Sequence, residues 1–443
     1  MKHRRQFDLV VIGAEPCGLV AAACAAREGA ACAIIETGLE APLGPSAPAI
    51  PNFVWRRLDL HETALTVEPV SAYVSLFKNG DKFATYKNDR RTAEAVRSQD
   101  PGDGALWEDF VGEMRSHTER SLSFRDFLVD GETAGAAQTA HTPHLMTDAA
   151  MTDALVTVLN DYFQNDTLKA HLAAIAGAAF AIGGEEPGSR LAASSICGDD
   201  AWRIKNAQAL SETLDHLCAS LGVARIMSPI ESIDRQDPRT FIIDLSDGDE
   251  VRTGALMASS SRIARAAGLQ IDGDPSPIFA DENVEAVVTF TLSSDAEPPA
   301  QDIAGDSAIY YIAENPDEVR AARDAVLEGR TPDNPPLVIE FAGREVVVRA
   351  PYCPRMLASD EGSREWTGQD RQLLGARVAQ RLAEYLNGAL DGIETTDVRL
   401  LHIAPDDLDR APIETSSPIA APEPDADEIG AAARLALKLV ANG

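Results

Sequence analysis

Phe7-Asp8-Leu9-Val10-Val11-Ile12-Gly13-Ala14-Glu15-Pro16-Cys17-Gly18 is the stretch that decides the fold of this chain. Residues 7 to 12 form a short apolar run that ends at a glycine, which predicts a buried parallel strand and a tight turn. Pro16 to Glu28 predicts the following helix, because proline is tolerated in a first turn. Ala31 to Glu36 predicts a second strand, and the three pieces make a β-α-β unit typical of dinucleotide binding.

The glycine spacing of this turn departs from the usual fingerprint at one position. Gly13 and Gly18 stand where a glycine makes the tight turn and where a glycine lets the helix pack closely on the strand. Glu15 replaces the middle glycine, which normally lets the backbone approach a pyrophosphate. Glu36 ends the second strand about 20 residues past the turn, where an acid holds ribose hydroxyls.

Composition bounds the class of protein. The 443 residues are 45% hydrophobic, which is enough for two or three compact units. The net charge of -31 argues against nucleic acid or an anionic membrane surface as a partner. No apolar run reaches the roughly 18 residues of a membrane span. The six cysteines are scattered without a C-x-x-C pair, so we expect a cytoplasmic protein.

The rest of the chain predicts two further groups of strands. Residues 230–235, 241–245 and 251–258 predict a small meander that returns to the first unit, with Asp247-Gly248 as a turn. Residues 74–77 and 83–86 predict two short strands around Asn79-Gly80, a strong hairpin signal. The sheet of a second domain is predicted from residues 284–292, 308–312, 337–341 and 345–350, and long helices from 369–386 and 428–440. The expected class is therefore α/β, with an α+β second domain.

Several segments carry a family resemblance. They are Asp8 to Ala23, Tyr86 to Ala93, Asp100 to Phe110, Trp202 to Gly222, and Pro405 to Arg410. On these segments, which span most of the chain, the sequence resembles the phytoene-desaturase-like flavoprotein oxidoreductases, including the pyridine nucleotide-disulfide oxidoreductase domain-containing protein 2 type.

The resemblance implies an FAD-binding Rossmann-like flavoprotein fold with a discontinuous substrate domain built on a mixed sheet. The FAD-binding domain would comprise residues 1–75, 205–275 and 387–443, and the substrate or cap domain residues 76–204 and 276–386. It also implies FAD as cofactor and oxidation of an apolar substrate, and it makes Gly13, Glu15, Gly18, Glu36 and Gly430 the ancestral FAD positions.

The chain departs from the family at each of four glycine-bearing elements. Besides Glu15, residues 37–44 lack the family's glycine pair, as do residues 202–207 after the tryptophan. Before Gly430 the approach reads Ala420-Ala421-Pro422-Glu423-Pro424-Asp425-Ala426-Asp427-Glu428 in place of a glycine-rich run. Four departures at one site predict lost or weakened FAD binding.

A physical hypothesis accounts for these replacements together. Helix N-termini present unsatisfied N–H groups and a positive dipole end, which a pyrophosphate normally satisfies. We expect Glu15 at the first helix, and Asp425, Asp427 or Glu428 at the last, to supply that negative charge and to cap the helices.

Two functions from different classes remain open. The first is a non-catalytic binding or assembly subunit, whose partner would be an active relative, a second copy of the chain or an apolar small molecule. Rab escort and GDP-dissociation-inhibitor proteins, which have a flavoprotein fold, offer an analogy. The second is an active FAD-dependent oxidoreductase of the dehydrogenase or desaturase type.

Other motifs predict no separate chemistry. His141-Thr142-Pro143-His144 has no acidic or cysteine partner at helical spacing, so we predict no metal site. Ser259-Ser260-Ser261 follows a strand without a nucleophile elbow. Cys17 and Cys24 share one helical face and predict core packing. No residue is named as a catalytic acid, base or nucleophile.

Overall fold

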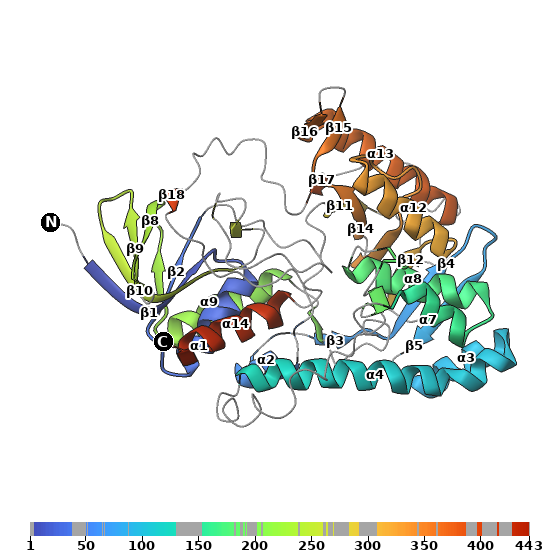
Figure 1. Ribbon diagram of the computed structural model, residues 1–443, viewed down its shortest axis with the longest axis horizontal. Helices are drawn as coiled ribbons and strands as arrows, with labels where there is room; N and C mark the ends of the chain where they lie inside the picture. Colours follow the sequence, from blue (N-terminus) through green and yellow to red (C-terminus); the bar gives the residue numbers. More distant parts are fainter. Residues whose placement is uncertain are drawn as a thin grey trace.

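The computed structural model divides the chain between two mixed sheets and their helices (Figure 1). The residues described below are 4–37, 50, 52–63, 65, 67–86, 88–129, 153–180, 183–186, 189–190, 192, 202–204, 207–237, 240–259, 263–264, 269, 283–291, 308–342, 345–359, 362–386, 397–400, 414–415 and 428–442.

The first sheet confirms the predicted β-α-β unit. β1 (Arg4–Ile12) pairs in parallel with β2 (Cys32–Ile35), and helix α1 (Pro16–Arg27) connects them. On its other edge β1 pairs in parallel with β10 (Glu250–Ala258). The full order is β18-β8-β9-β10-β1-β2-β7, with β7 (Ala224–Ile226), β8 (Ile230–Asp237), β9 (Thr240–Leu245) and β18 (Glu414–Thr415).

Apolar side chains alternate between the two faces of the central strands, and both faces of this sheet are buried. Leu9 and Val11 face one core together with α1, α9 (Ala207–Ser220) and α14 (Glu428–Asn442). Val10 and Ile12 face a second core together with residues of the meander β8-β9-β10. Alanines dominate the faces of α1 and α14 that meet, so these two helices approach closely.

The second sheet is larger and mixed. Its order is β17-β11-β14-β13-β12-β4-β5, with β4 and β12 the parallel neighbours. The strands are β4 (Ala72–Leu76), β5 (Lys82–Tyr86), β11 (Asn283–Thr291), β12 (Ala308–Ile312), β13 (Leu337–Ala342), β14 (Glu345–Pro354) and β17 (Asp397–Leu400). As predicted, β4 and β5 form a hairpin around Asn79-Gly80, where Gly80 has a φ of 87°.

Helices cover both faces of the second sheet. One face packs on α13 (Gly368–Tyr385), through residues such as Leu374 and Val378. The opposite face packs on α8 (Asp166–Phe180) and α12 (Pro316–Leu327), which belong to a cluster with α3 (Asp89–Gln99), α4 (Pro101–Val129) and α7 (Leu155–Tyr162). The smaller elements are α2 (Asn52–Arg57), η1 (Leu60–Glu62), the pair β3 (Val67–Pro69) and β6 (Trp202–Ile204), and the pair β15 (Leu357–Ser359) and β16 (Gly362–Arg364).

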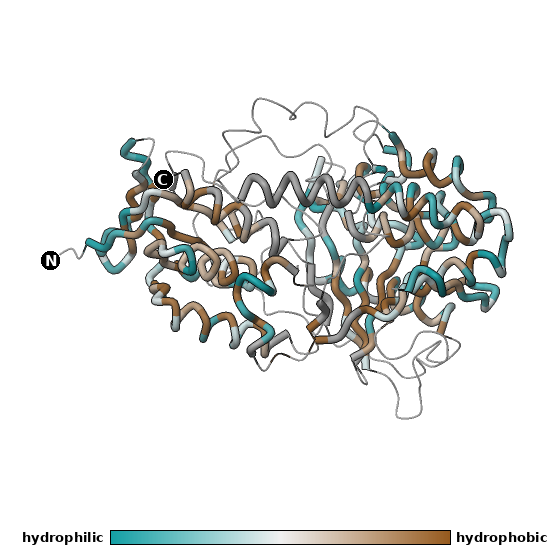
Figure 2. The backbone as a smooth tube through the Cα atoms, turned by 90° about the horizontal axis from the view of Figure 1, so that it is seen from below, coloured by the Kyte–Doolittle hydropathy of each residue, from teal (hydrophilic) through white to brown (hydrophobic). Residues whose placement is uncertain are grey.

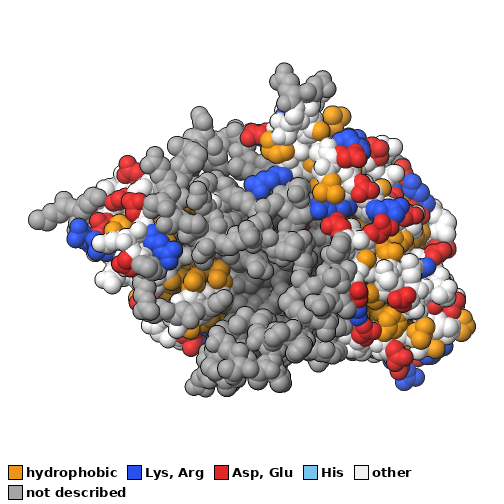
Figure 3. Space-filling view, viewed as in Figure 1, with side chains coloured by type: hydrophobic (Ala, Val, Ile, Leu, Met, Phe, Trp, Pro, Cys, Tyr) orange, Lys and Arg blue, Asp and Glu red, His pale blue; other side chains and the backbone are white. Residues whose placement is uncertain are grey.

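Hydropathy and charge follow this arrangement. Hydrophobic stretches run along the strands and helices of both halves in Figure 2. On the surface of the half around the second sheet, acidic and basic side chains are interspersed (Figure 3). No helix within the described residues is both long and apolar enough to cross a membrane.

Two features of the organisation differ from the expectations. β4, at residues 72–76, and β17, at 397–400, belong to the second sheet, although both lie largely in segments expected in the first domain. α12 lies between the strands predicted at 308–312 and 337–341, where no helix is predicted. The first difference arises because strand partners far apart in sequence leave no local pattern. The second concerns a helix that begins at Asn315-Pro316, a cap and first-turn proline.

Candidate functional site

The turn between β1 and α1 is built as tightly as its glycines predicted. Gly13 has a φ of 103°, a conformation that favours glycine, and a Cβ there would lie 2.4 Å from Ser259 Oγ. A Cβ on Gly18 would lie 2.1 Å from the carbonyl oxygen of Gly13. Both glycines are therefore required by the approach of β1, α1 and the end of β10.

Glu15 lies inside this turn and is almost fully buried. Its side chain is 7% exposed, and Ser259 Oγ donates a hydrogen bond of 3.0 Å to Glu15 Oε1. Ser259 directly follows β10, and its own backbone N–H donates to the carbonyl of Ile12 at 2.8 Å. The carboxylate is therefore held between the start of α1 and the carboxyl end of β10.

The expected cap by Glu15 is wrong in its detail. Glu15 is the N-cap residue of α1 by its extended backbone, with φ of -68° and ψ of 166°, but its side chain makes no capping hydrogen bond. The carboxylate accepts from Ser259 instead, because β10 ends beside the turn. The negative charge still lies at the positive end of the helix dipole. Asp425 and Asp427 lie outside the described residues, as does the side chain of Glu428.

Glu36 lies where the sequence placed it, directly after β2. Its carboxylate accepts a charge-assisted hydrogen bond from the guanidinium of Arg225, which belongs to the adjacent strand β7. Arg225 also pairs with Asp215 on α9 at 3.0 Å. The acid at the ribose position is thus engaged by a cation of the chain itself.

The structure brings Gly13, Glu15 and Gly18 together, and places Glu36 at the end of the neighbouring strand. Gly430 lies in the first turn of α14, a helix that packs on α1. The sequence interpretation missed Ser259 and Arg225 as partners of the two acids. The serine run after β10 carries no local signal for a contact with Glu15, and nothing local to Arg225 indicates that β7 pairs with β2.

A second polar group lies on the sheet of the other domain. Arg349 Nη1 is 3.3 Å from Glu285 Oε1, and its Nη2 is 3.5 Å from Glu340 Oε1. The rings of Tyr73 and Tyr311 lie nearby on β4 and β12, with centroids 6.1 Å apart. All five side chains extend from the sheet face opposite to the one that packs on α13.

We call this group the Arg349 cluster; it consists of Tyr73, Glu285, Tyr311, Glu340 and Arg349. Burial and the neighbouring charges shift the pKa values of its members. Burial raises the pKa of the Glu285 carboxyl, although Arg349 opposes the change. Burial also acts to lower the pKa of Arg349, but Glu285 and Glu340 outweigh it and hold that pKa above its ordinary value. The arginine therefore stays charged between two acids.

Among the described residues, the remaining candidates from the sequence add no further site. The described residues contain no group of three His, Cys, Asp or Glu side chains placed to hold a metal. His141 and His144 lie outside the described residues, as do Ser260 and Ser261. Cys17 and Cys24 are buried, as core packing predicted, and burial raises the pKa of the Cys24 thiol to about 12.

No protein-family model and no curated protein matches the chain. Among solved structures, a triple variant of putrescine oxidase is similar over 99% of this chain and 100% of its own, with 14% identity and a TM-score of 0.49.

Two further solved structures are similar at lower identity. The Rab GDI of Plasmodium falciparum covers 94% of this chain and 94% of its own, with 9% identity and a TM-score of 0.47. A geranylgeranyl bacteriochlorophyll reductase-like protein of Thermoplasma acidophilum covers 99% of this chain and 79% of its own, with 9% identity and a TM-score of 0.45. At these scores the strand order itself carries the assignment of the fold: α/β, with a Rossmann-like β-α-β unit and two mixed sheets.

Proposed function

We propose that this protein is a non-catalytic binding or assembly protein that does not hold FAD in the ordinary dinucleotide mode. The observation that carries the proposal is the buried carboxylate of Glu15, hydrogen-bonded to Ser259 in the turn where a pyrophosphate would lie. Its partners would be an active relative, a second copy of the chain or an apolar small molecule.

The backbone of the turn suits a bound pyrophosphate, whereas the charge of the turn disfavours one. Gly13 and Gly18 keep the close packing that a dinucleotide site needs. A carboxylate about 4 Å from a phosphate costs on the order of 4 kcal/mol at an effective dielectric near 20, or about three decades of affinity. The residues therefore fit the shape of a pyrophosphate site and do not fit its charge.

The ribose position supports the same proposal. Glu36 is paired with Arg225, whose guanidinium is also held by Asp215. A ribose hydroxyl would have to compete with this ion pair for the carboxylate. Charge-assisted hydrogen bonds are stronger than neutral ones, so the competition disfavours the ribose.

An FAD titration of the purified protein tests the proposal. We expect the protein to be colourless, and we expect calorimetry to detect no FAD binding at micromolar concentrations. Replacing Glu15 by glycine or by glutamine removes the charge, and we expect both variants to gain FAD affinity by about a hundredfold or more. E28Q removes a carboxylate at the other end of α1 and serves as the matched control, with no gain expected.

Two results would contradict the loss of FAD binding. A purified protein that retains stoichiometric flavin absorbance after gel filtration contradicts the proposal, as does equal FAD binding by the native protein and E15Q.

An FAD-dependent oxidoreductase of the dehydrogenase or desaturase type is the second candidate. The Arg349 cluster favours it, because charged and phenolic side chains converge on one face of the second sheet. In that case Gly13, Gly18 and Glu36 would contact the cofactor, which would supply the redox chemistry. A bound flavin that is reduced on addition of an apolar substrate would establish this function in place of the first.

A further inference from the structure

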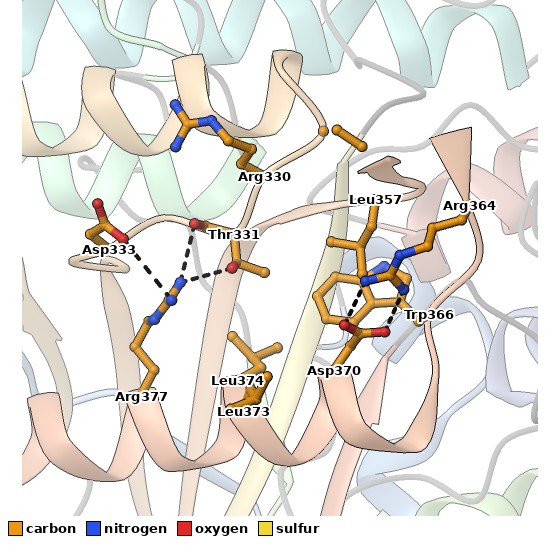
Figure 4. A pocket seen from close by; sticks show the side chains of 12 residues that line it. Arg330, Thr331, Asp333, Leu357, Arg364, Trp366, Asp370, Leu373, Leu374 and Arg377 are labelled. Carbon is orange, nitrogen blue, oxygen red and sulfur yellow. Dashed lines mark hydrogen bonds and ion pairs between the residues drawn. The ribbon is translucent and has the colours of Figure 1, made fainter. Parts of the chain in front are cut away.

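A cavity of about 340 Å³ lies beside α13, on the side of the second sheet opposite to the Arg349 cluster. Figure 4 shows the side chains that line it. α13 contributes one helical face with the spacing i, i+3, i+4, i+7, namely Asp370, Leu373, Leu374 and Arg377. The hairpin β15-β16 and the segment after α12 supply the remaining walls. The volume is at the lower end of the range of small-molecule sites.

One wall of the cavity is apolar. Leu357, Trp366 and Leu374 line it and are 8%, 3% and 2% exposed. The indole N–H of Trp366 donates to the carbonyl of Pro354 at 2.8 Å, so this ring is fixed in place. Leu373 also lines the cavity and is 60% exposed, which leaves apolar surface open to an incoming group.

Arg377 is fixed at the opposite side of the cavity. Its Nη1 donates to Thr331 Oγ1 at 2.8 Å, to the carbonyl of Pro332 at 2.9 Å and to the carbonyl of Thr331 at 3.2 Å. These neutral oxygens orient the guanidinium without cancelling its charge. Its Nη2 lies 4.0 Å from a carboxylate oxygen of Asp333, a side chain that is 88% exposed.

The other two arginines of the cavity have closer acidic partners. Arg364 makes a two-pronged pair with Asp370 at 2.6 and 2.8 Å, and Arg364 holds the pKa of that carboxyl well below its ordinary value. Arg330 pairs with Glu328 through its Nε, at 2.9 Å, and its Nη2, which both donate to Glu328 Oε2. Arg377 is therefore the position where positive charge is least compensated within the cavity.

We propose that this cavity binds an organic anion that carries one carboxylate beside a compact apolar body. The carboxylate would pair with Arg377, because arginine and carboxylate match in a two-pronged geometry. The apolar body would cover Leu373, Leu374 and Trp366. Such a group is found in a free carboxylic acid and in a glutamate next to an apolar residue of a peptide. This site is separate from the turn that holds Glu15.

Calorimetric titration with 3-phenylpropanoate and its neutral amide tests the proposal on the full-length protein. We expect the acid to bind, and we expect the affinity of the amide to be lower by at least about tenfold, because the amide cannot form a charge-assisted pair. An acetylated, amidated Glu-Phe dipeptide is the second probe. Binding of this dipeptide supports a peptide as the source, and binding of the free acid alone supports a small molecule.

Two variants locate the binding. R377M keeps the apolar stem and removes the charge, and we expect it to lose at least about tenfold in affinity. R371M, on the same helix but outside the cavity lining, is the matched control, and we expect its affinity to be unchanged. L373S changes an exposed side chain, so it leaves the fold intact, and we expect a loss of about threefold or more.

Three results would overturn the proposal. They are no binding of the acid or the dipeptide at millimolar concentration, equal affinity for the acid and the amide, and native affinity in both R377M and L373S.

Discussion

At the scale of single residues, hydroxyl groups hold two buried polar side chains in place. Glu15 accepts a hydrogen bond from Ser259 and lies at the positive end of α1. His171 on α8 is fully buried between two hydroxyls, with Nδ1 2.8 Å from Ser75 Oγ and Nε2 3.0 Å from Thr85 Oγ1. A neutral imidazole suits this setting, since one nitrogen donates and the other accepts.

The setting of His171 makes stability depend on pH. Burial lowers its pKa from 6.5 to about 3. Between these values the unfolded chain binds a proton that the folded chain does not, so the free energy of unfolding falls as the pH falls. This histidine alone should contribute a slope of up to about 1.4 kcal/mol per pH unit in that window, and none above it.

Urea unfolding of the native protein and of H171Q at several pH values measures this contribution. We expect H171Q to be less stable at neutral pH and to have a shallower slope between pH 6.5 and 4. H216Q removes an exposed histidine of α9 and is the control. Parallel slopes for the native protein and H171Q would show that His171 is not responsible.

At the scale of elements, cap residues mark where two helices of the second half begin. α13 begins with a capping box, in which Thr367 Oγ1 accepts from the backbone of Asp370 at 3.3 Å and Asp370 accepts from the backbone of Thr367 at 2.9 Å. Asn315 caps α12 in a similar way, accepting from the backbone of Glu318 at 2.9 Å. Asn315-Pro316 is therefore a sequence signal for the start of α12, a helix missing from the elements predicted above.

Removal of the cap of α13 should have a measurable cost. We expect T367A to lower the free energy of unfolding by about 1 kcal/mol, because the N–H of Asp370 loses its partner. Chemical denaturation of T367A and of S363A, which changes an exposed serine on β16, gives the comparison. Equal stability of the two variants would mean that the box contributes nothing.

At the scale of the whole molecule, the net charge of -31 dominates the long-range electrostatics. Self-repulsion of this charge opposes the compact state, whereas exposed ion pairs such as Arg90–Glu94 each contribute little. Salt screens both the repulsion and the ion pairs. The repulsion is the larger of the two because it is summed over many residues. The surface charge should therefore destabilise the fold at low ionic strength.

Thermal unfolding at different salt concentrations tests this balance. We expect the melting temperature to rise by a few degrees between about 0.02 and 0.3 M sodium chloride, where the Debye length falls to well below the size of the molecule. Tetramethylammonium chloride at the same ionic strength separates screening from specific ion effects. A melting temperature that falls with both salts would mean that the ion pairs outweigh the repulsion.

The sequence alone determined the β1-turn-α1-β2 unit, the meander and the hairpin at Asn79-Gly80, because glycine turns and apolar periodicity act over short stretches. Only the tertiary structure decided what the two acids of the unit do. Ser259 and Arg225 meet Glu15 and Glu36 across 244 and 189 residues of sequence, and no local pattern encodes such contacts. The order of the strands, which sets β10 and β7 beside this unit, brings these pairs together.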